Sequence, residues 1–473
     1  MYSYETYFGN NYYNTKNPQT AKAKNAEPVA SEQKRVQVKH KFTRIMKEVP
    51  FNPTFAASSL RTRLSSNEEK QKYNNLQKNL NRHTCKELEA LLKRGILLNA
   101  DSTDGSSVLD NLDKILTTPR ADGLNSKQIA QNLIETLNNP SKITQQFGNI
   151  PKNRENEVVD AYMQTTGIKD INQAKQEVNV THSGTCVAAS IEYSLARKNP
   201  AEFSRFTEGL TSVNNSVDKK IHLDKLADNT LDAIWLLNAF EVPYKDISYK
   251  EATLTFKPDK DAIIRAKIQT EDYDKGERTP IDVLMQSAFM QVGSQQAYNS
   301  IADKRAGKFN QNDKGLIEFE KTFTESVVED ENKISVTYQK VDENARLTGY
   351  ETDWDTMKRH LTQTLDMGDN VIIGYTQTDN NNIIINGHEI TIIGYQKDRS
   401  GKLSFICNDT DDNSDKTISY SEDYLLPKIH HAALPKHIVQ NDVKMVENWV
   451  EGLEKYKEQR QQLKQSDTQA VAA

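Results

Sequence analysis

Residues 382–396, NIIINGHEITIIGYQ, are dominated by β-branched side chains around an Asn-Gly pair. Such side chains favour strands, and Asn-Gly favours a tight turn between strands. Other segments share this character and are separated by Asn, Asp and Gly: residues 261–271, 333–341, 370–378 and 402–409. The part of the chain after about residue 240 is therefore predicted to be rich in antiparallel strands.

The sequence before these strands has a helical pattern. Between residues 67 and 148, one helix is expected to start at a capping box of Thr84 and Glu87, and another at Asn125. Helices are expected to continue from about 155 to 240, with one helical insertion at 279–305. Helices first and strands second predict an α+β fold rather than alternating βαβ units.

A chain of 473 residues is too long for one ordinary core and predicts two or three domains. Residues 1–50, rich in Asn, Tyr, Lys and Gln, are expected to be a disordered tail. Residues 51–150 are expected to form a helical accessory region or pro-region, and residues 155–435 the main domain. A helix and a polar tail are expected in residues 436–473.

Composition narrows the classes of partner and compartment. The net charge of −5 gives no reason to expect a nucleic-acid partner, and no apolar run approaches the roughly 20 residues that span a bilayer. Three cysteines are too few for a disulfide scaffold and suit a reducing compartment. A cytoplasmic protein without a membrane partner is expected, while export without a cleavable signal and the oligomeric state stay open.

Cys186 lies in the segment HSGTCVAASIEYSLAR, residues 182–197, where a turn of small residues runs into a helical pattern. The cysteine would occupy the first turn of that helix, where free N–H groups and the helix dipole favour an anionic thiolate. Gly184 would let a substrate backbone approach closely. A packed, unreactive cysteine fits the same stretch, so this segment alone does not assign a nucleophile.

Two further segments supply the partners that a cysteine nucleophile needs, namely a base and a group that orients the base. His388 follows the Asn-Gly pair and is expected at the head of a strand, from which it can project into a cleft. The strand of residues 402–409 ends in Asn408 and Asp409. A hairpin through residues 397–402 would bring one of these two side chains beside the imidazole and fix its tautomer.

These three segments together resemble the papain-like cysteine peptidases. SGTCVAASIEYSLA resembles the segment of their catalytic cysteine, NGHEITIIGY their histidine strand, and LSFICND the strand that carries their orienting Asn. The resemblance covers residues of about 155–435, and calpain-like and staphopain-like members share the order. It implies two lobes, a helical lobe with Cys186 and a β-rich lobe with His388 and Asn408, and no cofactor.

The chain departs from the family pattern in two places. Val187 replaces the aromatic residue that follows the cysteine, and Val180 replaces the Gln that donates to the oxyanion. Losing one such donor costs on the order of 100-fold or more in rate. Asn179 or Gln176 is a candidate substitute, with Asn179 preferred. Members of the family that use Asp as the third residue keep Asp409 as an alternative to Asn408.

The function expected from the resemblance is a cysteine hydrolase, a peptidase that cleaves protein or peptide substrates through an acyl-enzyme on Cys186. Two alternatives stay open: an acyl transferase of the transglutaminase type on the same triad, and an inactive domain that binds proteins. The acidic residues from Asp409 to Asp415 resemble a calcium loop, but Ser414 and Tyr420 stand where such a loop has Gly and Glu. No metal site is expected.

Overall fold

The computed structural model describes residues 60–439 apart from 149, 180–182, 224, 225, 227–243, 246–250, 272–276, 295, 306–314, 317, 343 and 412–415. The tail expected at residues 1–50 and the helix expected after residue 440 lie outside this range. The described residues form helices and antiparallel sheets, which confirms the α+β class. Among them, no helix is long and apolar enough to cross a membrane.

The principal sheet has six antiparallel strands in the order β12-β11-β10-β9-β13-β6. Their bounds are Lys333–Thr337 for β6, Val371–Thr378 for β9, Ile384–Lys397 for β10, Leu403–Asn408 for β11, Ile418–Ser421 for β12 and Ile429–Pro435 for β13. A helix, α14 (Trp354–Asp366), packs its buried Met357 and Leu361 into the apolar core of this sheet. The strands predicted at 333–341, 370–378, 382–396 and 402–409 are thus confirmed.

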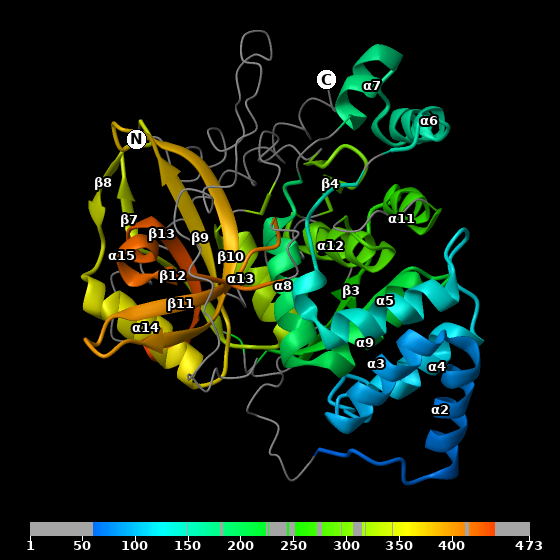
Figure 1. Cartoon of the computed structure of the whole chain (residues 1–473). Helices are drawn as coiled ribbons and strands as arrows, with labels where there is room; N and C mark the ends of the chain where they lie inside the picture. Colours follow the sequence, from blue (N-terminus) through cyan, green and yellow to red (C-terminus); the bar gives the residue numbers. More distant parts are fainter. Residues whose placement is uncertain are drawn as a thin grey trace.

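Most helices lie beside this sheet, on the right in Figure 1. Their bounds are Asn67–Asn79 (α2), Arg82–Lys93 (α3), Val108–Thr117 (α4), Ser126–Asn138 (α5), Glu155–Thr166 (α6), Ile171–Val178 (α7), Cys186–Lys198 (α8), Pro200–Thr211 (α9), Ala262–Glu271 (α11), Pro280–Gly293 (α12) and Glu318–Glu329 (α13). In Figure 1, α8 and α13 run between the sheet and the other helices. The helical region therefore contacts the six-stranded sheet mainly through α8 and α13.

Short elements complete the described chain. They are η3 (Pro140–Lys142), β1 (Val217–His222), β2 (Tyr244–Lys245), β3 (Glu251–Phe256), β4 (Tyr298–Asn299), β5 (Lys304–Arg305), β7 (Gln339–Val341), β8 (Leu347–Tyr350), α15 (Glu422–Leu425), η5 (Leu426–Lys428) and α16 (Lys436–Val439). Strands β1, β3 and β2 form a small antiparallel sheet. The prediction of continuous helix from 155 to 240 is therefore wrong at β1, where every second residue is buried.

Two other local predictions are wrong. The segment at 261–271 is the helix α11 and not a strand, because its buried residues Ala262, Arg265, Ala266 and Gln269 recur with the helical period. The capping box at Thr84 is also absent. Helix α3 begins earlier, since the side chain of Asn81 accepts the Thr84 N–H at 3.0 Å.

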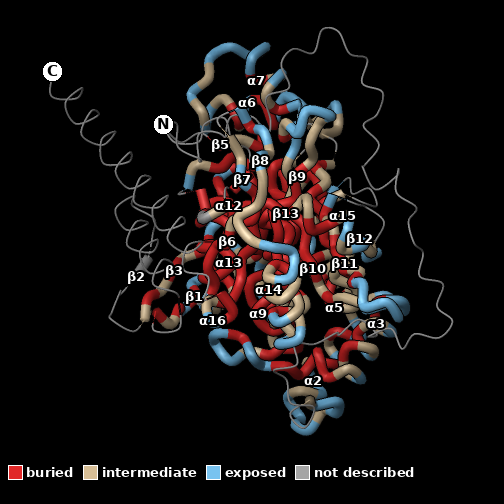
Figure 2. Tube along the Cα trace, turned by 90° about the vertical axis from the view of Figure 1, so that its left-hand side faces the viewer, coloured by how far each residue is buried: buried red, intermediate tan, exposed pale blue. Residues whose placement is uncertain are grey.

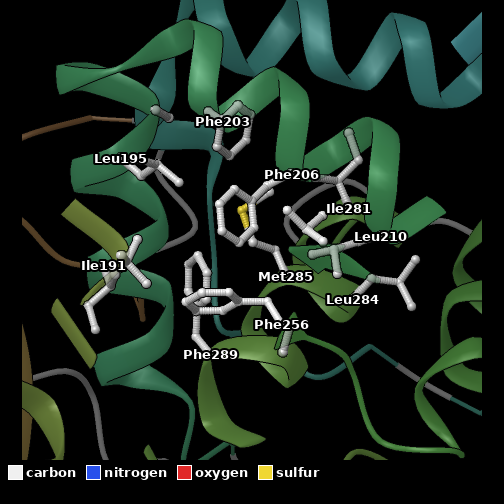
Figure 3. Close-up of a cluster of buried hydrophobic side chains, with 14 of the residues drawn as sticks. Ile191, Leu195, Phe203, Phe206, Leu210, Phe256, Ile281, Leu284, Met285 and Phe289 are labelled. Atoms are coloured by element: carbon white, nitrogen blue, oxygen red, sulfur yellow. The ribbon is translucent and has the colours of Figure 1, made fainter. Parts of the chain in front are cut away.

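One hydrophobic core crosses the boundary expected near residue 150. It combines apolar side chains of α2–α5 with those of α8, α9, α12 and α13. Its centre contains Phe206, Phe256 and Phe289, whose rings meet edge to face with centroids 5.1–6.1 Å apart (Figure 3). Figure 2 shows buried residues through the centre of the molecule and α2 near the bottom of the view. Helices α2–α5 are therefore an integral part of the helical region.

Deleting residues 1–150 should abolish cooperative unfolding, because the deletion strips apolar cover from α8, α9 and α12. Thermal unfolding followed by circular dichroism would measure this. A deletion of residues 1–50 is the control and should leave the transition unchanged. A truncated protein that unfolds cooperatively and is more active than the full chain would instead identify 51–150 as a removable pro-region.

A buried group of charges ties α8 to the sheet. The ammonium of Lys198, the last residue of α8, lies 2.7 Å from Glu329, 2.6 Å from Glu331 and 2.5 Å from Asp369. Lys333, at the start of β6, lies 2.9 Å from the same Glu329. Lys198 and Lys333 are almost inaccessible to solvent. Such buried pairs are costly to break, since a charge that loses its partner stays in a medium of low polarity.

Replacing Lys198→Met should therefore lower the free energy of unfolding by about 3–5 kcal/mol, because the carboxylates of Glu329, Glu331 and Asp369 lose one of their two lysines. Urea denaturation of the full chain measures the change. The matched control is Lys402→Met, which breaks the exposed pair with Asp423 and should have little effect. Equal effects of the two substitutions would contradict a stabilising role for the buried cluster.

Candidate active site

Cys186 is the first residue of α8, as predicted, and is 5% exposed. The preceding residue, Thr185, does not cap the helix with its side chain; its hydroxyl bonds to Gln286 Oε1 at 2.8 Å instead. Among the described residues, the side chain at the N-cap therefore accepts no hydrogen bond from the first N–H groups of α8, which most helices cap in this way. Together with the helix dipole they favour negative charge beside the Cys186 sulfur.

Hydrogen bonds to buried polar groups fix the turn before Cys186. The N–H of Gly184 donates to the carboxylate of Asp303. Gln286 of α12 donates to Glu192 of α8 and to the carbonyl of Thr144, both at 2.9 Å. Burial, reinforced by the nearby Asp282 carboxylate, raises the pKa of Glu192 well above its ordinary value. A neutral Glu192 thus links α8 to α12 without an unpaired buried charge.

His388 lies within β10 and not at its head. The expected turn at Asn386 and Gly387 is wrong: neither residue has the positive φ that a tight Asn-Gly turn requires, and β10 runs through them from Ile384. In its pairing with β9, the strand has a register shift between Ile384 and Asn386. His388 faces Tyr375 of β9 in the ladder. Its imidazole is therefore carried by a paired strand and not by a loop.

The predicted hairpin between β10 and β11 is present and delivers the third residue. Asn408 pairs with Thr391 at the end of β11, and Asp409 follows directly. Asp409 Oδ1 lies 2.6 Å from His388 Nε2, which identifies Asp409 as the partner of the imidazole. The side chain of Asn408 is buried, and its Nδ2 has no hydrogen-bond partner. Of the two residues left open by the sequence, Asp409 therefore orients His388.

His388 interacts with both Asp409 and Cys186. Burial on its own would lower the pKa of His388, but the charge and hydrogen bond of Asp409 and a hydrogen bond with Cys186 raise it well above its ordinary value. Burial would raise the pKa of Asp409, whereas the charge and hydrogen bond of His388 hold it below its ordinary value. At neutral pH the imidazole is thus protonated between a carboxylate and the Cys186 sulfur.

The sequence did not reveal the residues that hold the loop after Asp409. Thr144 and Gln145, between η3 and α6, bond to the carbonyl of Thr410 through a hydroxyl at 3.0 Å and a backbone N–H at 2.9 Å. Gln146 Nε2 donates to the carbonyl of Asp411 at 2.7 Å. No sequence motif predicts this role, because these polar residues bind a loop that lies about 265 residues later in the chain.

The remaining predicted residues are not brought to the triad by described contacts. Asn179 is exposed at the end of α7 and forms no described hydrogen bond with Cys186, so its role at the oxyanion stays a prediction. Asn413 and Asp415 of the acidic loop lie outside the described residues, as does His182 at the start of the segment that carries Cys186. Asp409 and Asp411, the first two oxygen donors of that loop, are bonded to His388 and Gln146 instead.

Comparison of the chain with protein-family models, with curated proteins and with solved structures finds no match. The geometry of the site is therefore the ground on which a function is assigned.

The charge of Asp409 makes a pH-dependent prediction. In an Asp409→Asn variant the amide keeps a hydrogen-bond acceptor but loses the negative charge, so the pKa of His388 should fall. The imidazolium would then lose its proton at lower pH, which NMR titration of ¹⁵N-labelled histidine measures. Asn408→Ala is the control and should leave this titration unchanged. An unchanged His388 titration in Asp409→Asn would contradict the coupling.

Proposed function

We propose that the chain is a papain-like cysteine hydrolase, with a helical lobe that carries Cys186 and a β-rich lobe that carries His388 and Asp409. The observation that carries this proposal joins three side chains: Asp409 lies 2.6 Å from His388, and the nearby Cys186 helps to raise the pKa of the His388 imidazole. They come from a helix terminus, a strand and the residue after the next strand, and form the line of nucleophile, base and orienting acid. A packed structural cysteine would not need a protonated imidazole beside it.

The chemistry of these groups suits an amide substrate. The Cys186 thiolate attacks the carbonyl carbon, the C–N bond of the tetrahedral intermediate breaks, and His388 donates its proton to the departing amine. Amines are poor leaving groups unless they are protonated, and the raised pKa of His388 keeps a proton available at neutral pH. His388 then takes a proton from water, which attacks the thioester and releases the acid. A protein or peptide is the substrate class proposed.

Stabilisation of the oxyanion is assigned to the backbone. The N–H of Cys186 belongs to the first turn of α8, which no side chain caps. Backbone N–H groups at such a position are typical oxyanion donors in acyl transfer. The Cys186 N–H thus supplies one oxyanion donor in a chain that has Val180 in place of the expected Gln.

The three cysteines allow an internal test of the nucleophile. Cys186 is less exposed than Cys85, so simple accessibility predicts faster labelling of Cys85 by iodoacetamide. We expect the reverse at pH 6, because Cys186 is the proposed nucleophile beside the His388 imidazole, whereas Cys85 lies in α3, outside the triad. Burial raises the pKa of the Cys407 thiol, so Cys407 should stay unlabelled. Mass spectrometry of tryptic peptides would measure the three rates.

Activity is tested with the full chain on an unfolded protein such as reduced casein. Cys186→Ala should abolish cleavage, and His388→Ala should reduce it by about 100- to 10,000-fold, the usual contribution of acid–base catalysis. Cys85→Ala is the matched control and should cleave at the normal rate. Full cleavage by Cys186→Ala, or labelling of Cys186 no faster than that of Cys85, would refute the proposed mechanism.

A further inference from the structure

A second group of reactive side chains lies across the sheet from His388. Successive side chains of a strand point to opposite faces, so Glu389, the next residue of β10, points away from the face of His388. Its carboxylate lies 3.1 Å from Nε2 of His431 on β13 and 3.3 Å from the ammonium of Lys321 on α13. The proposed catalysis uses none of these groups.

Two adjacent histidines meet here because of a β-bulge. In the ladder between β13 and β9, Ile429 faces Tyr375 and His431 faces Gly374, so His430 is an extra residue. Adjacent side chains of a regular strand point to opposite faces, whereas a bulge re-aims one of them. The two imidazole rings accordingly lie edge to face, with centroids 5.2 Å apart. Both histidines are buried.

Glu318, the first residue of α13, completes the group. One carboxylate oxygen of Glu318 and one ring nitrogen from each of His430 and His431 all lie within 4.8 Å of one another. Two imidazoles and one carboxylate form a ligand set that Zn²⁺ accepts, with a solvent molecule in the fourth position. Among the described residues, the other comparable group is Glu329, Glu331 and Asp369, where Lys198 and Lys333 already supply positive charge.

The surroundings orient these side chains as the outer partners of metal ligands do. Glu389 contacts Nε2 of His431, while Nδ1 of the same ring is buried and has no hydrogen-bond partner among the residues that the structure describes. Ser335 and Thr337 of β6 both donate to Oε1 of Glu318, at 2.6 and 2.7 Å, so Oε2 is the atom left to bind an ion. Buried polar atoms rarely lack partners, and His431 Nδ1 therefore points to a missing ligand.

Charge and space agree with a bound cation. The carboxylates of Glu318 and Glu389 provide two negative charges against the one positive charge of Lys321. Gly374 leaves room for the ring of His431, because a Cβ at this position would lie 2.3 Å from His431 Cε1.

We propose that Glu318, His430 and His431 bind one divalent transition-metal ion, with Zn²⁺ the ion that fits this ligand set best. The ion would join α13 to β13 at the bulge. Its function would be to fix the sheet on which His388 stands. The proposal does not depend on the identity of the reaction at Cys186.

The test uses full-length protein carrying Cys186→Ala, so that the thiol of the triad cannot bind metal. The protein is stripped with a chelator, incubated with Co²⁺, desalted and analysed for cobalt. We expect one equivalent of cobalt with the visible absorption of a tetrahedral site. X-ray absorption of the zinc form should show N and O ligands at about 2.0–2.2 Å and no sulfur.

Four further substitutions in this background separate ligands from bystanders. His431→Ala and the nearly isosteric Glu318→Gln should each abolish cobalt retention, and Glu389→Gln should weaken affinity by about 10- to 100-fold. His83→Gln, which removes an exposed histidine of α3, is the matched control and should keep one equivalent. Circular dichroism verifies that each variant is folded. Folded Cys186→Ala protein without cobalt, or full retention in Glu318→Gln, would overturn the proposal.

Discussion

Burial of α8 on all sides is the constraint on which the rest of the structure depends. Every residue of this helix except Arg197 is buried, which places it at the centre of the molecule and not on its surface. Both helix ends must then find polar partners inside the protein. At the C-terminal end, Lys198 supplies a positive charge where the helix dipole is negative. At the N-terminal end, the side chain of Thr185 is used elsewhere, and Cys186 stands beside the uncapped N–H groups.

The parts of the fold that could be predicted from the sequence are those in which local preference and tertiary packing agree. The hairpin of β10 and β11 was predicted because its strands are rich in β-branched residues and its turn contains Gly401, which has a φ of +91°. Helix α11 was mistaken for a strand, since Ile263 and Ile264 outweighed a helical spacing of buried residues. The strand propensity of these residues was overridden by the burial of one face of the helix. That burial depends on α12, so it could not be predicted from the segment alone.

At the site, the residue types were predictable but their final geometry was not. Cysteine, histidine and a carboxylate or amide were expected to meet because a hairpin brings the last two together. Whether Asn408 or Asp409 reaches His388 depends on the register of β11, and the pairing of Asn408 with Thr391 decides it. A shift of one residue exchanges the two faces of a strand, so neighbouring side chains cannot both reach the same imidazole.

The contact between Thr144 and Thr410 also sets an order of events in time. These two residues are 266 positions apart, and a ribosome adds about 5–20 residues per second. The cysteine is therefore synthesised tens of seconds before the loop that aligns its histidine, and the loop can dock only on a segment made long before it. Cys186 leaves the ribosome before His388 and Asp409 are made, so the proposed hydrolysis requires the last strands of the chain to be in place.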